Sequence, residues 1–215
     1  MKHIPVLIVT RLTSERLPRK PFMDIGGMSM IEHIIKRCEF YDFRPYLCVP
    51  ESEGNEFAGE TSCLDIFEGS PDNVRDRVLA AAKYWKISEF HQLDGDDPYF
   101  NPFLIKFGQV HQPNCLAPME SEGGAGLCGT WYHLEDDREP TRAFYKTDSP
   151  WFQRLTVDYP EDLEMMRALH RMGCDYMTPR SIVDDFFRRN PDLHKINWYR
   201  TAEWKKRQND EKYRR

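Results

Sequence analysis

Short apolar runs alternate with amphipathic stretches along most of the chain. Apolar residues continue almost without a break from residue 3 to residue 10, which is typical of a strand buried on both faces. Similar short runs predict strands at 45–49, 64–67, 89–93 and 154–157. Apolar positions at helical spacing predict helices at 30–40, 73–85, 102–110, 161–172 and 179–187. This alternation predicts an α/β sandwich around a largely parallel sheet.

The apolar pattern weakens between residues 116 and 149, where four glycines lie between 123 and 129. We interpret this stretch as a loop or a mobile insertion. Residues 1–194 are predicted to form a single domain. Residues 195–215 carry eight basic and three acidic side chains, which predicts a basic C-terminal tail or helix.

Charge and composition narrow the classes of function. The net charge is −5, and because residues 195–215 contribute +5, the first 194 residues carry −10. An acidic body argues against nucleic-acid binding. No apolar run has the length of a membrane span and no export signal is visible, so we expect a cytoplasmic protein. The six scattered cysteines form no C-x-x-C pair, which indicates reduced thiols rather than zinc ligands or disulfides.

A basic segment follows the first predicted strand. Arg11, Arg16 and Lys20 are spaced by five and four residues, with Arg19 between the last two. They would converge on one polyanion if the loop curls, since guanidinium groups bind phosphate in forked pairs and lysine supplies a point charge. No Walker motif is present. We expect a triphosphate site here, and the alternative is a solvated basic loop.

An acidic turn follows the strand predicted at 89–93. Asp94, Asp96 and Asp97 surround Gly95, which permits close approach of a ligand. Hard oxygen ligands at a strand end suit Mg²⁺, which takes one or two carboxylates and completes its shell with phosphate and water. The alternative is an acidic turn that caps the following helix.

A second carboxylate is expected from the segment 154–163. Glu161 and Asp162 fall in the first turn of a predicted helix, where acidic residues suit the helix dipole without any function. That explanation does not cover Asp158, which ends the predicted strand. Asp158 is therefore the candidate partner of Asp96.

The segment 69–77 leads from a strand into a helix. Backbone amides at this helix start, together with Ser70, could hold an anion or the edge of a base. Alternatively, Ser70 or Asp72 caps the helix. No G-x-S-x-G motif is present, which disfavours hydrolysis by an activated serine.

Taken together, these segments resemble the cytidylyltransferases that activate acidic sugars as CMP conjugates. The family includes the acylneuraminate and 3-deoxy-manno-octulosonate enzymes and, closer here, the SpsF-type spore-coat polysaccharide proteins. The matching segments, in family order, are 10–22, 27–33, 69–78, 95–102, 137–141 and 154–163. The resemblance implies a Rossmann-like nucleotide-diphospho-sugar transferase fold, a three-layer sandwich with a mostly parallel mixed sheet.

The resemblance also implies roles for individual residues. Arg11, Arg16 and Lys20 would be catalytic and bind the CTP phosphates, while Asp96 and Asp158 would bind Mg²⁺. The remaining expected nucleotide contacts are Thr10, Ser14, Ser70 and Arg77. The implied reaction is displacement at the α-phosphorus, in which an ulosonic or nonulosonic acid receives CMP and pyrophosphate leaves. Such a product would serve surface polysaccharide synthesis.

This sequence departs from the family pattern at several positions. Thr10 replaces the usual alanine, Arg19 the usual glycine, and Asp94 a residue that is often uncharged. The stretch before Asp137 is short where relatives carry acceptor-binding and dimer-forming elements, so the resemblance leaves the acceptor and a homodimer open.

Three alternatives stand beside the leading hypothesis. The first is CMP transfer to another acid, such as a phosphonate. The second is a glycosyltransferase in which Asp94 and Asp96 form a D-x-D metal motif. The third is a non-catalytic descendant that binds a partner through its basic tail.

Overall fold

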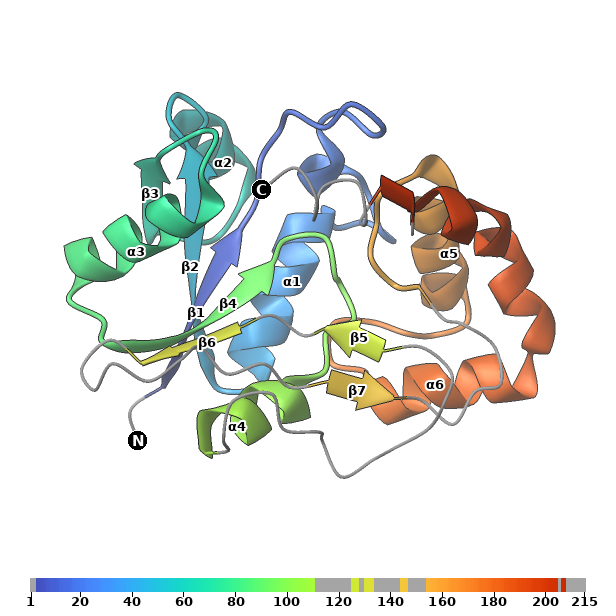
Figure 1. The fold of residues 1–215 in the computed structure, drawn as a ribbon. Helices are drawn as coiled ribbons and strands as arrows, with labels where there is room; N and C mark the ends of the chain where they lie inside the picture. The colour runs from blue at the N-terminus through green and yellow to red at the C-terminus, as the bar shows by residue number, and fades with distance from the viewer. Residues whose placement is uncertain are drawn as a thin grey trace.

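The computed structural model describes residues 3–110, 125–127, 130–133, 144–146, 154–204, 206 and 207. At its centre lies a sheet with strand order β3-β2-β1-β4-β6 (Figure 1). Its strands are β1 (Ile4–Val9), β2 (Phe43–Pro50), β3 (Ile66–Gly69), β4 (Glu89–Asp94) and β6 (Thr130–His133). Three pairings are parallel, and β6 runs antiparallel to β4. This confirms the predicted α/β fold with a mostly parallel mixed sheet.

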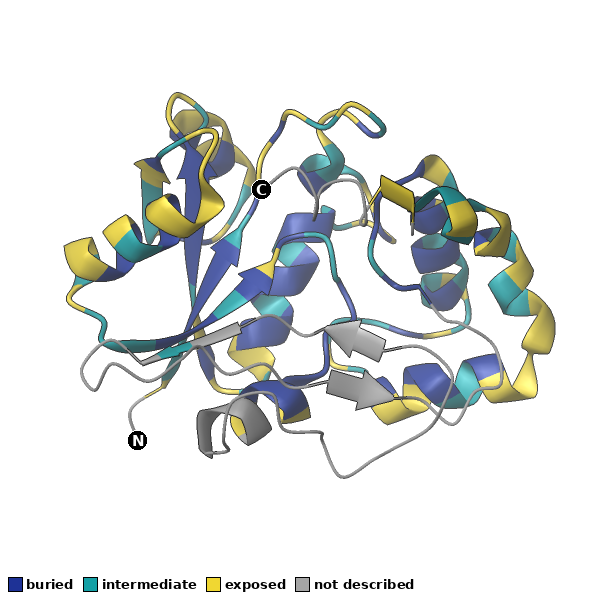
Figure 2. Cartoon of the chain, in the orientation of Figure 1, coloured by how far each residue is buried: buried dark blue, intermediate teal, exposed yellow. Residues whose placement is uncertain are grey.

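Helices cover both faces of the sheet, because the side chains of its strands alternate in direction. Leu7 of β1 packs with Val78 and Ala82 of α3, whereas Val6 and Ile8 point into the larger core beside α1. Figure 2 shows β1 and β2 largely buried between these layers. The helices are α1 (Met30–Phe40), α2 (Gly54–Glu60), α3 (Val74–Trp85), α4 (Pro102–Val110), α5 (Pro160–Arg171) and α6 (Arg180–Arg189). None of the helices in the described ranges is long and apolar enough to cross a membrane.

Two helices begin at polar caps. Ser29 at α1 and Asn73 at α3 each accept a hydrogen bond from the backbone N–H three residues later. The cap of α3 was expected at Ser70 or Asp72. Asn73 takes that role because it is the last residue with an extended backbone before the helix.

The prediction of a strand at 154–157 is wrong. These residues have no strand structure, although Leu155 and Val157 are buried as the apolar pattern requires. Val157 donates its backbone N–H to the Asp96 carbonyl at 2.8 Å, so this segment contacts the turn after β4 rather than extending the sheet. The apolar pattern reported the burial of these side chains correctly, but burial alone does not show that a segment pairs with a strand.

The glycine-rich region predicted as a loop contains short strands. Besides β6, these are β5 (Ala125–Leu127) and β7 (Phe144–Lys146), which pair antiparallel to each other. The rest of the 116–149 prediction lies outside the described residues. Near the C-terminus, two short 3-10 helices follow α6, namely η2 (Pro191–Ile196) and η3 (Trp198–Arg200). The domain boundary predicted at residue 194 stays a prediction.

His33 makes the fold sensitive to acid. This α1 residue is buried beside the rings of Tyr99 and Tyr176. Burial, followed by the charge of nearby Arg37, lowers the pKa of His33 to about 3. An unfolded histidine titrates near 6.5, so between these values protons bind the unfolded chain preferentially and stability falls as the pH drops.

We expect His33 to reduce the free energy of unfolding by about 2 kcal/mol between pH 7 and pH 5. His33→Phe keeps an aromatic ring in the core but cannot be protonated. Urea denaturation at pH 7, 6 and 5 should therefore give a flatter stability profile for the variant. Equal slopes for the two proteins would contradict the assignment.

Candidate functional site

The candidate site lies where β1 and β4 end side by side. In the strand order, β1 leads to its neighbour β2 on one side, whereas β4 leads to β6 on the other, and ligands bind at such a point in open α/β sheets. Gly95 donates its backbone N–H to the Val9 carbonyl at 2.8 Å. A Cβ on Gly95 would lie 2.7 Å from the Cβ of buried Thr10, so glycine is required for this approach. The basic loop after β1 and the acidic turn after β4 therefore share one edge.

Lys20 lies at the centre of this site. Its Nζ is 2.6 Å from Asp96 Oδ2, 3.0 Å from the Val157 carbonyl and 3.4 Å from Asp158 Oδ1. Arg16 Nη2 is 2.8 Å from the same Asp158 oxygen. The structure thus brings together Arg16, Lys20, Asp96 and Asp158, which are far apart in the sequence.

The loop that carries Arg16 and Lys20 is held by its own apolar residues. Leu12 and Leu17 are buried, and the backbone N–H of Leu12 donates to Glu53 Oε2 at 2.8 Å. Ser14 Oγ accepts from the backbone N–H of Leu17 at 3.4 Å, so the contact seen for Ser14 stabilises the loop. Arg19 has a φ of 56°, in the left-handed region that glycine adopts most easily.

The charges at the site are strongly coupled. Burial favours loss of the Lys20 proton, but Asp96 and then Asp158 outweigh it and raise the pKa of Lys20. Loss of solvation, followed by repulsion from Asp96 and Asp97, raises the pKa of the Asp94 carboxyl to about 7, although Asp94 is exposed at the surface. Burial raises the pKa of Asp97 to about 6. Repulsion between the neighbouring carboxylates of this turn therefore adds to the effect of desolvation.

The donor set fits a hard divalent cation that arrives with a phosphate. Within the described ranges no three His, Cys, Asp or Glu side chains converge as a ready-made metal site. Asp96 and Asp158 are instead bridged by one ammonium group. Two carboxylates are what Mg²⁺ takes from a protein when phosphate oxygens and water supply the rest.

A second cationic cluster stands at the start of α3. Arg77 is 2% exposed, and its Nη1 donates to the Ser70 carbonyl at 2.7 Å. Its Nε has no hydrogen-bond partner in the described part of the chain. Burial lowers the pKa of Arg77, and exposed Arg11 lowers it further. Ser70 Oγ accepts from the backbone N–H of Asn73 at 3.1 Å, so its contact is local.

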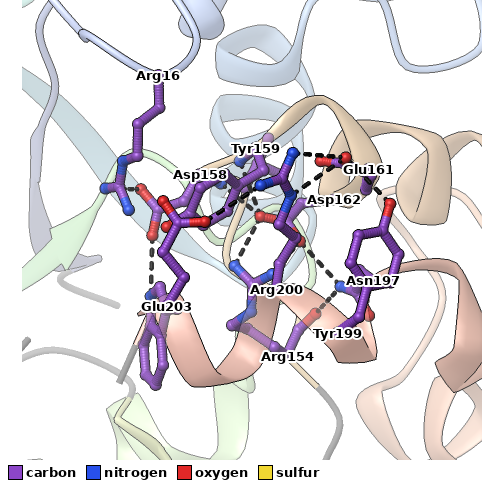
Figure 3. Close-up of polar contacts among 12 residues, drawn as sticks. Arg16, Arg154, Asp158, Tyr159, Glu161, Asp162, Asn197, Tyr199, Arg200 and Glu203 are labelled. Carbon is purple, nitrogen blue, oxygen red and sulfur yellow. Dashed lines mark hydrogen bonds and ion pairs between the residues drawn. The ribbon is translucent and has the colours of Figure 1, made fainter. Parts of the chain in front are cut away.

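Sequence reasoning missed the contacts that hold Asp158 (Figure 3). Buried Arg154 and Asp162 form a two-pronged ion pair at 2.7 and 2.5 Å. Asp162 Oδ2 also accepts the backbone N–H of Asp158 and of the α5 N-cap Tyr159, both at 2.9 Å. Trp204 donates its indole N–H to Asp158 Oδ2 at 3.0 Å. Trp204 lies 46 residues from Asp158, so no local motif could have indicated this contact.

Comparison with known proteins agrees with this geometry. A cytidylyltransferase family model matches residues 5–50, which span β1, the basic loop, α1 and β2. The spore coat polysaccharide biosynthesis protein SpsF of Bacillus subtilis (strain 168) is 24% identical, over 89% of this chain and 97% of that protein. In sequence the chain is similar to cytidylyltransferases. The family resemblance predicted from the sequence is confirmed.

Other matches point the same way. The 3-deoxy-manno-octulosonate cytidylyltransferase of Polynucleobacter asymbioticus is 30% identical, over 46% of this chain and 41% of that protein. A solved cytidylyltransferase from Leptospira borgpetersenii has a TM-score of 0.70 at 19% identity, covering 90% of this chain and 97% of its own. A Mycobacterium tuberculosis protein solved with manganese has a TM-score of 0.54 at 14% identity, covering 78% and 99%. Together the relatives and the shared fold indicate a nucleotidyltransferase.

Proposed function

We propose that this protein transfers CMP from CTP to an acidic sugar, with Mg²⁺ as its metal, and releases pyrophosphate. The acceptor class is that of the ulosonic and nonulosonic acids, since relatives include 3-deoxy-manno-octulosonate cytidylyltransferases. Similarity to SpsF over nearly the whole of that protein supports a role in polysaccharide synthesis. A homodimer, which the sequence left open, is not part of this proposal.

One observation carries this proposal. A lysine and an arginine from the loop after β1 contact two carboxylates from separate segments, all at the carboxyl edge of the sheet. Such an arrangement suits a metal–triphosphate, because the cations can move onto phosphate oxygens as the carboxylates take the metal. A diphosphate sugar needs less positive charge, so the same observation disfavours the D-x-D glycosyltransferase.

Catalysis would come from alignment and neutralisation of charge. Arg16 and Lys20 would bind the phosphates and stabilise negative charge as pyrophosphate leaves. Arg11 and Arg77 would bind the rest of the nucleotide, and the Nε of buried Arg77 has no hydrogen-bond partner among the described residues. Asp96 and Asp158 would hold the metal, which when bound supplies Lewis-acid polarisation of the phosphate. A hydroxyl or carboxylate oxygen of the acceptor would form a bond to the α-phosphorus as the bond to pyrophosphate breaks, and where a hydroxyl attacks, its proton would pass to solvent.

The test is calorimetric binding of CTP, UTP, ATP and GTP with Mg²⁺, followed by pyrophosphate release with ulosonic acids. We expect selective CTP binding that weakens at least tenfold in Asp96→Asn, because the metal loses one of its two carboxylates. Asp65→Asn is the matched control, since Asp65 precedes β3 and lies at the opposite edge of the sheet.

Each outcome of this test decides between named functions. Binding that ignores both the base and Asp96 would overturn the proposal. Binding of nucleotide sugars in place of triphosphates would favour the glycosyltransferase. Pyrophosphate release with a phosphonate but with no ulosonic acid would change the acceptor class while leaving the cytidylyl transfer intact.

A further inference from the structure

The segment 197–204 is folded onto the start of α5, next to the candidate site. Asn197 is 3% exposed, and its Nδ2 donates to the Arg154 carbonyl and to Asp162 Oδ1, both at 3.0 Å. Arg200 pairs with Glu161 at 3.0 Å. Figure 3 shows these side chains converging around the loop that carries Asp158. This part of the basic C-terminal region is therefore fixed to the body of the protein.

The two oxygens of the Asp158 carboxylate have different partners. Oδ1 accepts from Arg16 at 2.8 Å and faces Lys20 at 3.4 Å, on the side of Asp96. Oδ2 accepts the indole N–H of Trp204 at 3.0 Å. The carboxylate is thus held by one neutral donor on one oxygen and by two cations on the other.

We propose that Trp204 is a positioning residue for the metal, and that it acts by fixing the orientation of the Asp158 carboxylate. This inference rests on the proposed function, because it assigns Asp158 to the metal. Trp204 binds Oδ2 and so leaves Oδ1 directed at the point where Lys20 bridges Asp158 and Asp96. A cation that replaces the Lys20 ammonium there would meet a carboxylate already in place.

Without the Trp204 N–H, we expect the Asp158 carboxylate to change how it binds Arg16. A guanidinium group prefers to bind both oxygens of a carboxylate in a fork. With Oδ2 released, Asp158 can rotate toward Arg16, and metal binding must then break a two-pronged ion pair. Loss of a donor that orients a metal ligand typically costs 10–100-fold in metal affinity or activity.

The test compares Trp204→Phe with Trp198→Phe. Phenylalanine keeps an aromatic ring at residue 204 but removes the N–H donor. Trp198 belongs to the same segment, is 57% exposed and donates no hydrogen bond to Asp158 in the described part of the chain, so it is the matched control. We would titrate the full chain with Mn²⁺ by calorimetry in the presence of CTP. Pyrophosphate release would then be measured across a range of Mn²⁺ concentrations.

We expect Trp204→Phe to raise the Mn²⁺ dissociation constant and the half-saturating Mn²⁺ concentration about tenfold, with kcat at saturating Mn²⁺ largely retained. Trp198→Phe should match the wild type. An unchanged Mn²⁺ titration, or a fall in kcat that excess Mn²⁺ does not recover, would overturn the inference alone. A wild-type protein that binds neither Mn²⁺ nor CTP would overturn the proposed function and this inference with it.

Discussion

Asp158→Asn should lower cytidylyl transfer by about 10³-fold, equivalent to roughly 4 kcal/mol of transition-state stabilisation, while the protein remains folded. An amide keeps the size of the side chain but cannot offer Arg16, Lys20 and a metal the full negative charge that they share in Asp158. The Trp204 donor can still bond to an amide oxygen. The fold does not depend on the charge, because Asp162 holds the Asp158 backbone.

The control for this prediction is Asp162→Asn. Asp162 is fully buried and pairs with buried Arg154, and removing one partner of such a pair typically costs about 3–5 kcal/mol. We expect this variant to melt far lower, whereas Asp158→Asn melts near the wild type. Thermal melts and pyrophosphate release would be measured on both. An active Asp158→Asn protein, or one that is as unstable as Asp162→Asn, would contradict the separation of roles.

This contrast shows what the sequence could and could not predict. The helix-start explanation set Glu161 and Asp162 aside and kept Asp158 as the candidate ligand, because acidic residues in a first helical turn need no further function, and the role of Asp158 stays a prediction. Local spacing could not show that Asp162 also ties Arg154 and Asn197 together. Such a network depends on segments that meet only in the folded chain.

The elements with a strong local signal were predicted well. α1 begins and ends at the predicted Met30 and Phe40, since its apolar face is continuous and Ser29 caps it. α2 (Gly54–Glu60) was missed, because it is short and its core contact comes from Phe57. Leu64, expected in a strand, is 97% exposed, and β3 begins at Ile66. A short helix or strand that buries only one large apolar side chain shows too few apolar positions for its periodicity to be recognised.

Lys20→Met should have opposite effects on metal binding and on catalysis. Without nucleotide, the Lys20 ammonium occupies the point between Asp96 and Asp158 that a divalent cation would take. Removing this competing charge should tighten Mn²⁺ binding to the free protein about tenfold, the effect of one pKa unit of interaction. Turnover should fall about 10²–10³-fold, because the phosphates lose a cation that neutralises them in the transition state.

The stability of Lys20→Met should follow the same logic. Because Asp96 and Asp158 lose the cation that bridges them, the metal-free variant should melt at a lower temperature than the wild type. Added Mn²⁺ should raise the melting temperature of the variant more than that of the wild type. Arg19→Met is the matched control, since it removes one positive charge from the same loop but from a side chain that is 56% exposed and paired with Glu56. Equal Mn²⁺ affinity in Lys20→Met and the wild type would show that the lysine and the metal do not share a site. Turnover would then depend on Lys20 through the phosphates alone, and the carboxylates would have to release Arg16 instead before they could bind metal.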